Sequence, residues 1–537
     1  MANPLYDTLF GRHAGKTTAF LHLEGGVVLT HAGFLGRAAR FAHVLTDLGL
    51  KPGDRLAVQI DKSADALALY AACVQAGVIF LPLNTAYTAD EVRYFVTDSG
   101  AAAFVCQPAR RNEMAPVAKA AGCQLETLGA DNDGSFADRA TSASDNFETV
   151  ARDADDLAAF LYTSGTTGRS KGAMLTQANL LSNAQTLADL WRFTNADVLL
   201  HALPIFHTHG LFVATNVTLV AGGAMIFMPK LDIDRLIDRM PHATAMMGVP
   251  TFYTRLLDDA IFTRETTANM RLFISGSAPL LAETHVDFEE RTGHRILERY
   301  GMTETNMNTS NPYEGERRAG TVGLPLPDVE LKITDPETGA TLPDGEIGSI
   351  EVRGPNVFKG YWQMPEKTAA ELREDGFFIT GDLGRRDADG YVTIVGRDKD
   401  LIISGGYNIY PKEVELLLDD QPGVLESAVF GVPHPDFGES VVAVLMARRG
   451  AELDLAQIAG DVAGSLAKFK RPAKLIVLPE LPRNTMGKVQ KNVLRDTYRD
   501  LFQPGKGRPR AILAGIGAAV SPSHGAGLRC NLRQSGV

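Results

Sequence analysis

Short apolar runs, each long enough for one buried strand, alternate with helix-like segments through most of residues 25–395. The strand-like Arg55–Ile60, the helix-like Ser63–Gln75 and the strand-like Ala102–Cys106 are the first examples. Further strand-like runs are Ala224–Met228, Ala245–Met247 and Arg271–Ser275. Strands that alternate with helices favour α/β layers built on largely parallel sheets. The pattern therefore predicts an α/β fold for the greater part of the chain.

The pattern changes twice toward the C-terminus. From about residue 329, turn signals separate short strands at Glu330–Thr334, Gly348–Val352 and Tyr391–Val395, which indicates a β-rich subdomain. After residue 397 the sequence restarts as an α+β unit, with helix-like and strand-like segments at Pro411–Asp420, Leu425–Val432, Val441–Ala447 and Leu455–Ala467. We therefore expect a large N-terminal lobe over 1–397 and a smaller C-terminal lobe over 398–502.

Charge is distributed unevenly along the chain. The 53 basic and 64 acidic residues give a net charge of −11. Residues 503–537 contain no acidic residue and five basic ones, namely Lys506, Arg508, Arg510, Arg529 and Arg533. This segment also lacks an amphipathic period, so we expect a poorly ordered basic tail. An acidic body lacks the clustered cations that phosphate backbones require, and we expect no nucleic-acid partner.

Cysteine spacing and hydropathy indicate the cellular compartment in which the protein works. None of the four cysteines (Cys73, Cys106, Cys123 and Cys530) forms a C-x-x-C pair, so neither a zinc site nor a disulfide framework is indicated. The first residues contain no apolar signal region. The apolar run Ala66–Leu83 contains Gln75, Gly77 and Pro82, and is interpreted as a buried helix followed by a short strand. We expect a cytoplasmic protein without a membrane partner.

The strongest local motif is YTSGTTGRSKG at residues 162–172, directly after a strand-like run. Glycines and small hydroxyl residues expose backbone N–H groups to a phosphate, and the lysine adds a positive charge. The order differs from a Walker A loop, and a flexible linker is the alternative. The candidate phosphate-binding residues are Thr163, Ser164, Gly165, Thr166, Thr167, Gly168 and Lys171.

This motif resembles the phosphate loop of the adenylate-forming enzymes, which include acyl-CoA synthetases, luciferases and peptide-synthetase adenylation domains. Further motifs of that family follow in the expected order: YGMTET (300–305), TGD (380–382), GRDKD (396–400), SGGYNIYP (404–411) and PRNTMGK (482–488). The resemblance covers about residues 15–500. It implies a two-lobed fold in which a small α+β C-terminal lobe moves against a large lobe of stacked α/β sheets.

The resemblance assigns the nucleotide-binding roles. Glu304, with Thr167, would hold Mg²⁺ against ATP, and Tyr300 would offer a flat face to adenine. The wall of that pocket would come from Ser275, Gly276, Ser277 and Gly301. Asp382 would bind the ribose hydroxyls, and Arg397 ribose or phosphate. Without the family, Glu304 reads as an exposed glutamate, Tyr300 as a core tyrosine, Asp382 as part of an Asx turn and Arg397 as a surface arginine.

The resemblance also assigns catalysis and lobe movement. Lys488 would stabilise charge at the α-phosphate as a carboxylate attacks ATP, with Thr303 beside Glu304. The small lobe would then rotate about Lys399, so that a thiol of CoA reaches the acyl-adenylate. The residues expected on the CoA side are Ser404, Gly405, Gly406 and Tyr407. Lys171, Arg255, Arg397 and Lys488 are expected to meet in a small positive cleft of an acidic protein.

Two segments point to the acid. MGVPTFYTRL (247–256) and FHTHGLF (206–212) resemble the malonyl-CoA synthetases within this family. The resemblance implies that Arg255 and His207 bind the distal carboxylate. Arg169 is a further candidate for binding the acid or a phosphate, and Met302 for contacting the acid. Read alone, Arg255 is a solvent-facing helix residue after Pro250. We expect ATP-dependent malonate–CoA ligation by a monomer or weak homodimer. The alternatives are a ligase for methylmalonate or another short acid, an enzyme that loads a carrier protein, and a non-catalytic nucleotide sensor.

Overall fold

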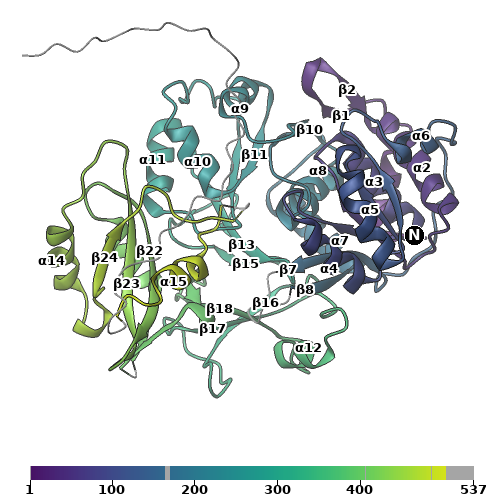
Figure 1. Ribbon diagram of the computed structural model, residues 1–537. Helices are drawn as coiled ribbons and strands as arrows, with labels where there is room; N and C mark the ends of the chain where they lie inside the picture. The colour runs from purple at the N-terminus through teal and green to yellow at the C-terminus, as the bar shows by residue number, and fades with distance from the viewer. Residues whose placement is uncertain (1, 164–169, 406, 485–486, 503–537) are drawn as a thin grey trace, which may run out of the picture.

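The computed structural model describes residues 2–163, 170–405, 407–484 and 487–502. The basic tail predicted over 503–537 lies outside these residues. Figure 1 shows the last elements of the chain, in yellow-green, grouped at one side of a larger body that contains the N-terminal elements. The α/β expectation is confirmed, because parallel sheets covered by helices make up most of this body.

The first sheet has six strands in the order β6-β5-β3-β4-β7-β8. All neighbours are parallel except the hairpin of β7 and β8. The strands are β3 (Arg55–Gln59), β4 (Ile79–Pro82), β5 (Ala103–Cys106), β6 (Gln124–Thr127), β7 (Leu157–Thr163) and β8 (Lys171–Thr176). The helices along this part of the chain are α2 (His31–Asp47), α3 (Ala64–Ala76), α4 (Ala89–Ser99), α5 (Arg111–Ala121) and α6 (Ser135–Ala140).

The second sheet has nine strands in the order β15-β14-β13-β12-β11-β9-β10-β1-β2. The six strands from β13 to β1 are parallel. The strands are β1 (Ala19–His22), β2 (Val28–Thr30), β9 (Val198–His201), β10 (Ala224–Phe227), β11 (Ala245–Gly248), β12 (Leu272–Ser275), β13 (Leu297–Met302), β14 (Asn306–Ser310) and β15 (Leu324–Pro325). The accompanying helices are α1 (Pro4–Leu9), α7 (Gln177–Leu190), the π-helix η4 (His209–Thr215), α8 (Asn216–Ala221), α9 (Ile233–Arg239), α10 (Pro250–Leu257) and α11 (Ala282–Thr292).

A four-stranded antiparallel sheet follows, as the turn-rich sequence predicted. Its strands are β16 (Glu330–Thr334), β17 (Gly348–Arg353), β18 (Phe378–Arg386) and β19 (Val392–Arg397), with α12 (Pro365–Glu371) between the second and third. The sequence left Asp382 open to an Asx turn. In the structure Asp382 lies within β18, opposite Arg397 of β19.

The C-terminal sheet has a core on each face. Its strands are β20 (Ile402–Ser404), β21 (Tyr407–Ile409), β22 (Val424–His434), β23 (Gly438–Ala447) and β24 (Lys474–Val477), and its helices are α13 (Pro411–Asp419), α14 (Leu455–Ser465) and α15 (Lys491–Tyr498). Alternate residues of β23 enter different clusters: Val441 and Ala443 pack under α13 and α14, whereas Val442 and Val444 pack under α15. This alternation follows from the two-residue repeat of a strand, and it gives the sheet hydrophobic cover on both sides.

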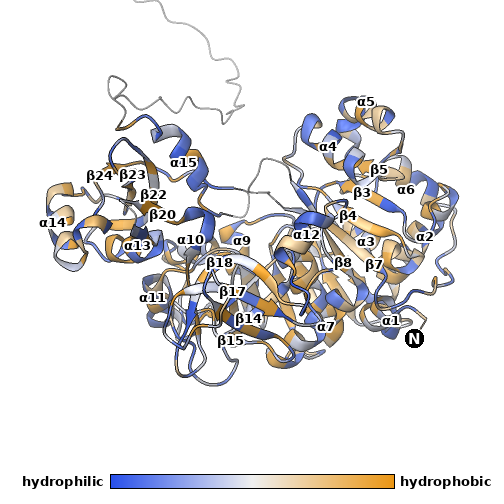
Figure 2. Cartoon of the chain, turned by 90° about the horizontal axis from the view of Figure 1, so that it is seen from below, coloured by the Kyte–Doolittle hydropathy of each residue, from blue (hydrophilic) through white to orange (hydrophobic). Residues whose placement is uncertain are grey.

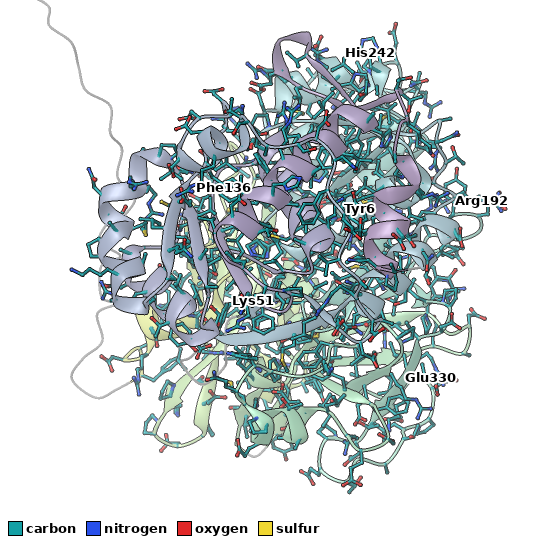
Figure 3. The ribbon with its side chains drawn as sticks, turned by 90° about the vertical axis from the view of Figure 1, so that its right-hand side faces the viewer. Tyr6, Lys51, Phe136, Arg192, His242 and Glu330 are labelled. Atoms are coloured by element: carbon teal, nitrogen blue, oxygen red, sulfur yellow. The ribbon has the colours of Figure 1, made fainter. Side chains whose placement is uncertain are left out.

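Apolar side chains concentrate inside both parts of the molecule. In Figure 2 orange gathers on the interior strands, and blue lies mainly along outer helices and loops. Figure 3 places Tyr6 and Phe136 within the packed body, while Arg192, His242 and Glu330 extend from its periphery. Helix α3 is buried along its whole length and is followed by the buried β4, as interpreted from Ala66–Leu83. No helix of the described residues is long and apolar enough to cross a bilayer.

Candidate active site

The phosphate-loop motif joins the two antiparallel strands β7 and β8, whose facing ends are Thr163 and Lys171. The candidates Ser164, Gly165, Thr166, Thr167, Gly168 and Arg169 lie outside the described residues. Lys171 is buried at the base of the loop, with Nζ 3.2 Å from the Tyr361 hydroxyl and 3.3 Å from Glu371 Oε2. The sequence did not single out Tyr361 or Glu371, which come from the segment around α12.

Glu304 lies close to this cation and is only 4% exposed. Its Oε1 accepts hydrogen bonds from the Tyr361 hydroxyl at 3.0 Å and from Thr163 Oγ1 at 3.3 Å. Burial raises the pKa of Glu304, and the positive charge of Lys171 opposes that rise. The described residues contain no group of three or more His, Cys, Asp or Glu side chains that could hold a metal. A cation at Glu304 would therefore share its ligands with a bound phosphate, as Mg²⁺ commonly does.

Three residues predicted to bind the nucleoside meet at one point. The Tyr300 hydroxyl donates to Asp382 Oδ2 at 2.6 Å, and Arg397 Nε lies 2.8 Å from Asp382 Oδ1. Tyr300 lies within β13, whereas the other two residues face each other across β18 and β19. Burial, followed by the charge of Asp382, raises the pKa of Tyr300. The arrangement presents an aromatic side chain beside a carboxylate and a guanidinium, which are groups suited to a nucleoside phosphate.

Lys488 of the C-terminal part reaches the same point. Burial lowers its pKa to about 8, and the nearby charge of Arg397 lowers it further while that of Asp382 raises it. The neighbouring Gly487 lies close to Thr251 of α10, because a Cβ atom added there would be 3.3 Å from Thr251 Oγ1. Gly487 and Lys488 thus bring the C-terminal part close to α10 and to the nucleoside cluster of the large lobe.

The expected hinge is flanked by two ion pairs. Lys399 lies in a short 3₁₀ turn, Asp398–Asp400. On one side Arg397 pairs with Asp382 of the large lobe, and on the other Asp400 pairs with Arg495 of α15 at 3.0 Å. The residues assigned to CoA begin just beyond this turn. Ser404 and Tyr407 face each other across β20 and β21, and Tyr407 is 57% exposed and stacks on Phe469. Gly406 lies outside the described residues.

A second polar cluster lies where β12 ends beside the middle of β13. Arg299 is buried, and its Nε and Nη2 have no hydrogen-bond partner among the described residues. Gly276 packs directly against it, since a Cβ atom there would lie 2.4 Å from the guanidinium carbon. Ser277 Oγ is 3.1 Å from His209 Nδ1, while His209 Nε2 and Ser275 Oγ also have no partner in the described part of the chain. Burial lowers the pKa of Arg299 to about 9.

The sequence did not single out Arg299 or His209. One signal was available: Glu298 and Arg299 are consecutive charged residues in a strand of an otherwise apolar parallel sheet, where charge is costly.

The predicted acid ligands Arg255 and His207 occupy different surroundings. Arg255 is exposed on α10 and lines a cavity of about 770 Å³ between the ends of the sheets and the loop before Lys488. His207 is half-buried, and burial lowers its pKa to about 4. Met302 and Thr303 are half-buried beside Glu304. Lys171, Arg397 and Lys488 therefore gather around Glu304 and Asp382, while Arg255 stands on the wall of the larger cavity.

Comparison with known proteins decides the family. The family model for AMP-binding enzymes matches residues 10–362, and that for their C-terminal domain matches residues 413–488. The chain belongs to the AMP-binding enzyme family. The family predicted from the ordered motifs is thereby confirmed, together with its two-lobed fold.

Individual relatives refine this placement. ATP-bound MatB from Rhodopseudomonas palustris has 59% sequence identity and a TM-score of 0.92, and the match covers 94% of this chain and all of that one. A malonate–CoA ligase of Arabidopsis thaliana is 35% identical over 84% of this chain and 79% of its own length. A feruloyl-CoA synthase of an Amycolatopsis species is also 35% identical, over 91% of this chain and 97% of its own length. Relatives with the same sequence identity to this chain are thus named for acids of very different size.

Proposed function

We propose that this AMP-binding enzyme joins malonate to CoA, with ATP converted to AMP and pyrophosphate through a malonyl-adenylate. The observation that carries the choice of a dicarboxylate is the buried guanidinium of Arg299. An uncompensated cation inside a protein is costly, and a substrate carboxylate would satisfy its free N–H groups. A monocarboxylic acid with an apolar tail would leave that cation unpaired. The similarity to a protein named malonate–CoA ligase supports the same choice.

Acid recognition is assigned to the polar cluster around Arg299, where β12 ends beside β13. The distal carboxylate of malonate would accept hydrogen bonds from Arg299, with His209 and Ser275 as further partners. Gly276 packs tightly against the guanidinium and would hold it in place for the carboxylate. His207 and Met302 remain candidates for its wall. Arg255, on the outer cavity, is a candidate for guiding anions inward, since exposed cations steer charged ligands over some distance.

The first half-reaction is assigned to the residues around Glu304 and Asp382. The reacting carboxylate attacks the α-phosphorus and pyrophosphate leaves. Lys488 and Arg397 offset the negative charge that develops there, while Lys171 with residues 163–168 holds the outer phosphates. Asp382 and Tyr300 orient the nucleoside, against a wall formed by residues 275–277 and Gly301. Mg²⁺, held by Glu304 with Thr167 and the phosphates, would neutralise phosphate charge, and Thr303 would support that glutamate.

The second half-reaction is assigned to a different arrangement of the lobes. Lys488 fills the space between them, so a thiol needs this loop to withdraw. Rotation at Lys399 of a lobe spanning 398–502, relative to 1–397, would withdraw it and bring Ser404–Tyr407 to the adenylate. The CoA sulfur then attacks the acyl carbon and AMP leaves.

The test is a panel of carboxylic acids with ATP and CoA, in which release of AMP is measured. We expect malonate to give the highest kcat/KM, with methylmalonate next, because one methyl group changes binding by only about 1–3 kcal/mol. A higher value for acetate, butyrate or ferulate would contradict the proposal. AMP release that is independent of CoA but requires a carrier protein would favour a carrier-loading enzyme.

We also propose a cellular compartment and an oligomeric state for the enzyme. Cys73, Cys106 and Cys123 carry free thiols, which suits a reducing cytoplasm. We expect a monomer or weak homodimer, without nucleic-acid or membrane partners. Light scattering over a range of protein concentrations tests the oligomeric state.

A further inference from the structure

A buried lysine lies beside the acid cluster, and none of the catalytic steps uses it. Lys62 follows β3 and is 9% exposed at the wall of the large cavity. Its Nζ is 2.9 Å from His201 Nδ1 and 2.8 Å from the His201 carbonyl oxygen, at the end of β9. The same ammonium group lies 4.3 Å from the ring centre of Phe227. Lys62 therefore connects the six-stranded sheet to the ends of β9 and β10 in the nine-stranded sheet.

The contacts of His201 define its tautomer. His201 Nε2 lies 2.9 Å from the carbonyl oxygen of Gly210, which can only accept a hydrogen bond. The proton is therefore on Nε2, and Nδ1 accepts the hydrogen bond from Lys62. Burial, and then the charge of Lys62, lowers the pKa of His201 and keeps the ring neutral. A continuous set of hydrogen bonds thus runs from Lys62 through His201 to the backbone of Gly210.

Gly210 connects these hydrogen bonds to the segment that carries His209. Its carbonyl oxygen also accepts from Thr215 Oγ1 at 3.0 Å. A Cβ atom at this position would lie 2.0 Å from the Pro204 carbonyl oxygen, so no side chain fits there without a shift of the backbone. The residue belongs to the first turn of the π-helix η4, directly after His209. Such π-helical turns are rare and are frequently found at functional sites.

We propose that Lys62 is a positioning residue for acid recognition, which acts through His201 and Gly210 to hold His209 and His207 against the acid pocket. This inference rests on the proposed function. Its consequence is specific: the hydrogen bonds fix the start of η4, from which His209 reaches Ser277. Without Lys62, the His201 ring and the Gly210 carbonyl would lose their fixed orientation. The nucleoside cluster around Asp382 would keep all of its own contacts.

Energetics favour this role over a purely structural one. A buried lysine is costly, and an apolar side chain of similar length would fill the same space more cheaply. A group that contributes only packing could therefore be replaced by methionine without loss of acid binding. A group that orients His201 could not.

The experiment compares Lys62→Met, His201→Leu and the double variant with the wild type in acid-dependent ATP–pyrophosphate exchange, which needs no CoA. We expect each single variant to raise KM for malonate about 10- to 100-fold, the size of effect that a displacement of about 1 Å produces, with little change in KM for ATP. The double variant should be no worse than the more affected single variant, because both act through one set of bonds. The matched control is Lys230→Met, an exposed lysine on the wall of the same cavity, which should change KM for malonate by no more than a few-fold.

A further variant keeps the test decisive if Lys62→Met does not fold. His201→Gln retains one acceptor for Lys62 and one donor for Gly210, and should recover most of the affinity that His201→Leu loses. Equal increases in KM for malonate and ATP, additive effects, or a folded Lys62→Met enzyme with unchanged KM would overturn the inference. If the wild type prefers another acid, the proposed substrate is wrong, and the same variants are then compared with the best acid of the panel.

Discussion

The hydroxyl of Tyr361 connects two oppositely charged groups: it donates a hydrogen bond to Glu304 Oε1 at 3.0 Å and lies 3.2 Å from Lys171 Nζ. The lysine also stands over the Tyr361 ring, 4.2 Å from its centre. Tyr361 comes from the segment before α12 and pairs with Ala173 of β8 through an isolated β-bridge. One side chain thus fixes the distance between the proposed metal ligand and the proposed phosphate-binding lysine.

Tyr361→Phe tests that connection. Loss of the hydroxyl frees Glu304 to rotate, and outer partners of metal ligands commonly contribute 10- to 100-fold to affinity. We expect the Mg²⁺ concentration for half-maximal adenylation to rise by about tenfold, with KM for malonate unchanged. A titration of Mg²⁺ in the exchange assay measures this. Tyr391→Phe is the control, because its hydroxyl donates to the Glu316 carbonyl oxygen instead. An unchanged Mg²⁺ requirement in Tyr361→Phe would show that the hydroxyl does not position Glu304.

Lys488→Ala separates the two half-reactions. The lysine lies beside Arg397 and Asp382 in this arrangement of the lobes, and the proposed thioester step needs it withdrawn. Adenylation should fall by at least about 100-fold, the usual size for loss of one transition-state charge partner, while conversion of preformed malonyl-adenylate with CoA should change little. Pre-steady-state measurement of each step tests this. Lys474→Ala, on the exposed strand β24, is the control. If both steps fall equally, Lys488 does not act in adenylation alone.

The pH profile of adenylation should report the same lysine. Burial lowers the pKa of Lys488 to about 8, so the group is mainly charged at pH 7 and loses its proton as the pH rises through 8. Because the charged form is the active one, kcat/KM should fall about tenfold per pH unit above that value. Lys488→Arg keeps its charge at higher pH. This variant should be slower but should lack the alkaline decline; persistence of the decline would assign it to another group.

Much of the architecture could be predicted from short-range patterns. The strand predicted at Glu330–Thr334 has the same bounds in the structure, and most other predicted strands and helices differ by one to three residues at their ends. The long strand β18 was missed, because the turn signal Thr-Gly-Asp occurs within it. The ordered motifs alone assigned Tyr300, Asp382 and Arg397 to one nucleotide site, and in the structure both Tyr300 and Arg397 contact Asp382.

The acid pocket was harder to predict for a physical reason. Arg255 was favoured because its segment carries a recognisable motif, yet a helix exposes residues on every side and the sequence does not say which side meets the site. Arg299 was overlooked because Tyr300 beside it carries the motif, and alternation along β13 points the two side chains to opposite faces. Tyr361 and Lys62 act through contacts between distant segments, which no local pattern encodes.

Arg299→Met and Arg255→Leu distinguish two accounts of acid recognition. If the buried guanidinium holds the distal carboxylate, Arg299→Met should raise KM for malonate at least about 100-fold, since a buried charge pair contributes about 3–5 kcal/mol when one partner is removed. Butyrate should then become a comparable or better substrate. Arg255→Leu should raise KM for malonate only a few-fold, and less so at high salt, because an exposed cation acts by steering. A large effect of Arg255→Leu with none of Arg299→Met would reverse the assignment.

Glu298, next to Arg299, should make stability depend on pH. Burial raises its pKa to about 8, from the ordinary 4.5 of an unfolded glutamate, and only 5% of the side chain is exposed. Between these two values the folded protein holds a proton that the unfolded chain releases. Stability from this group is therefore complete below pH 4.5 and declines by up to about 1.4 kcal/mol per pH unit as the pH rises toward 8.

Glu298→Gln stays neutral at every pH, so its melting temperature should decline less than that of the wild type between pH 5.5 and 8. Thermal scans at one heating rate measure the difference, with the exposed Glu330→Gln as the control. Parallel declines in the wild type and Glu298→Gln would mean that Glu298 is charged in the folded protein.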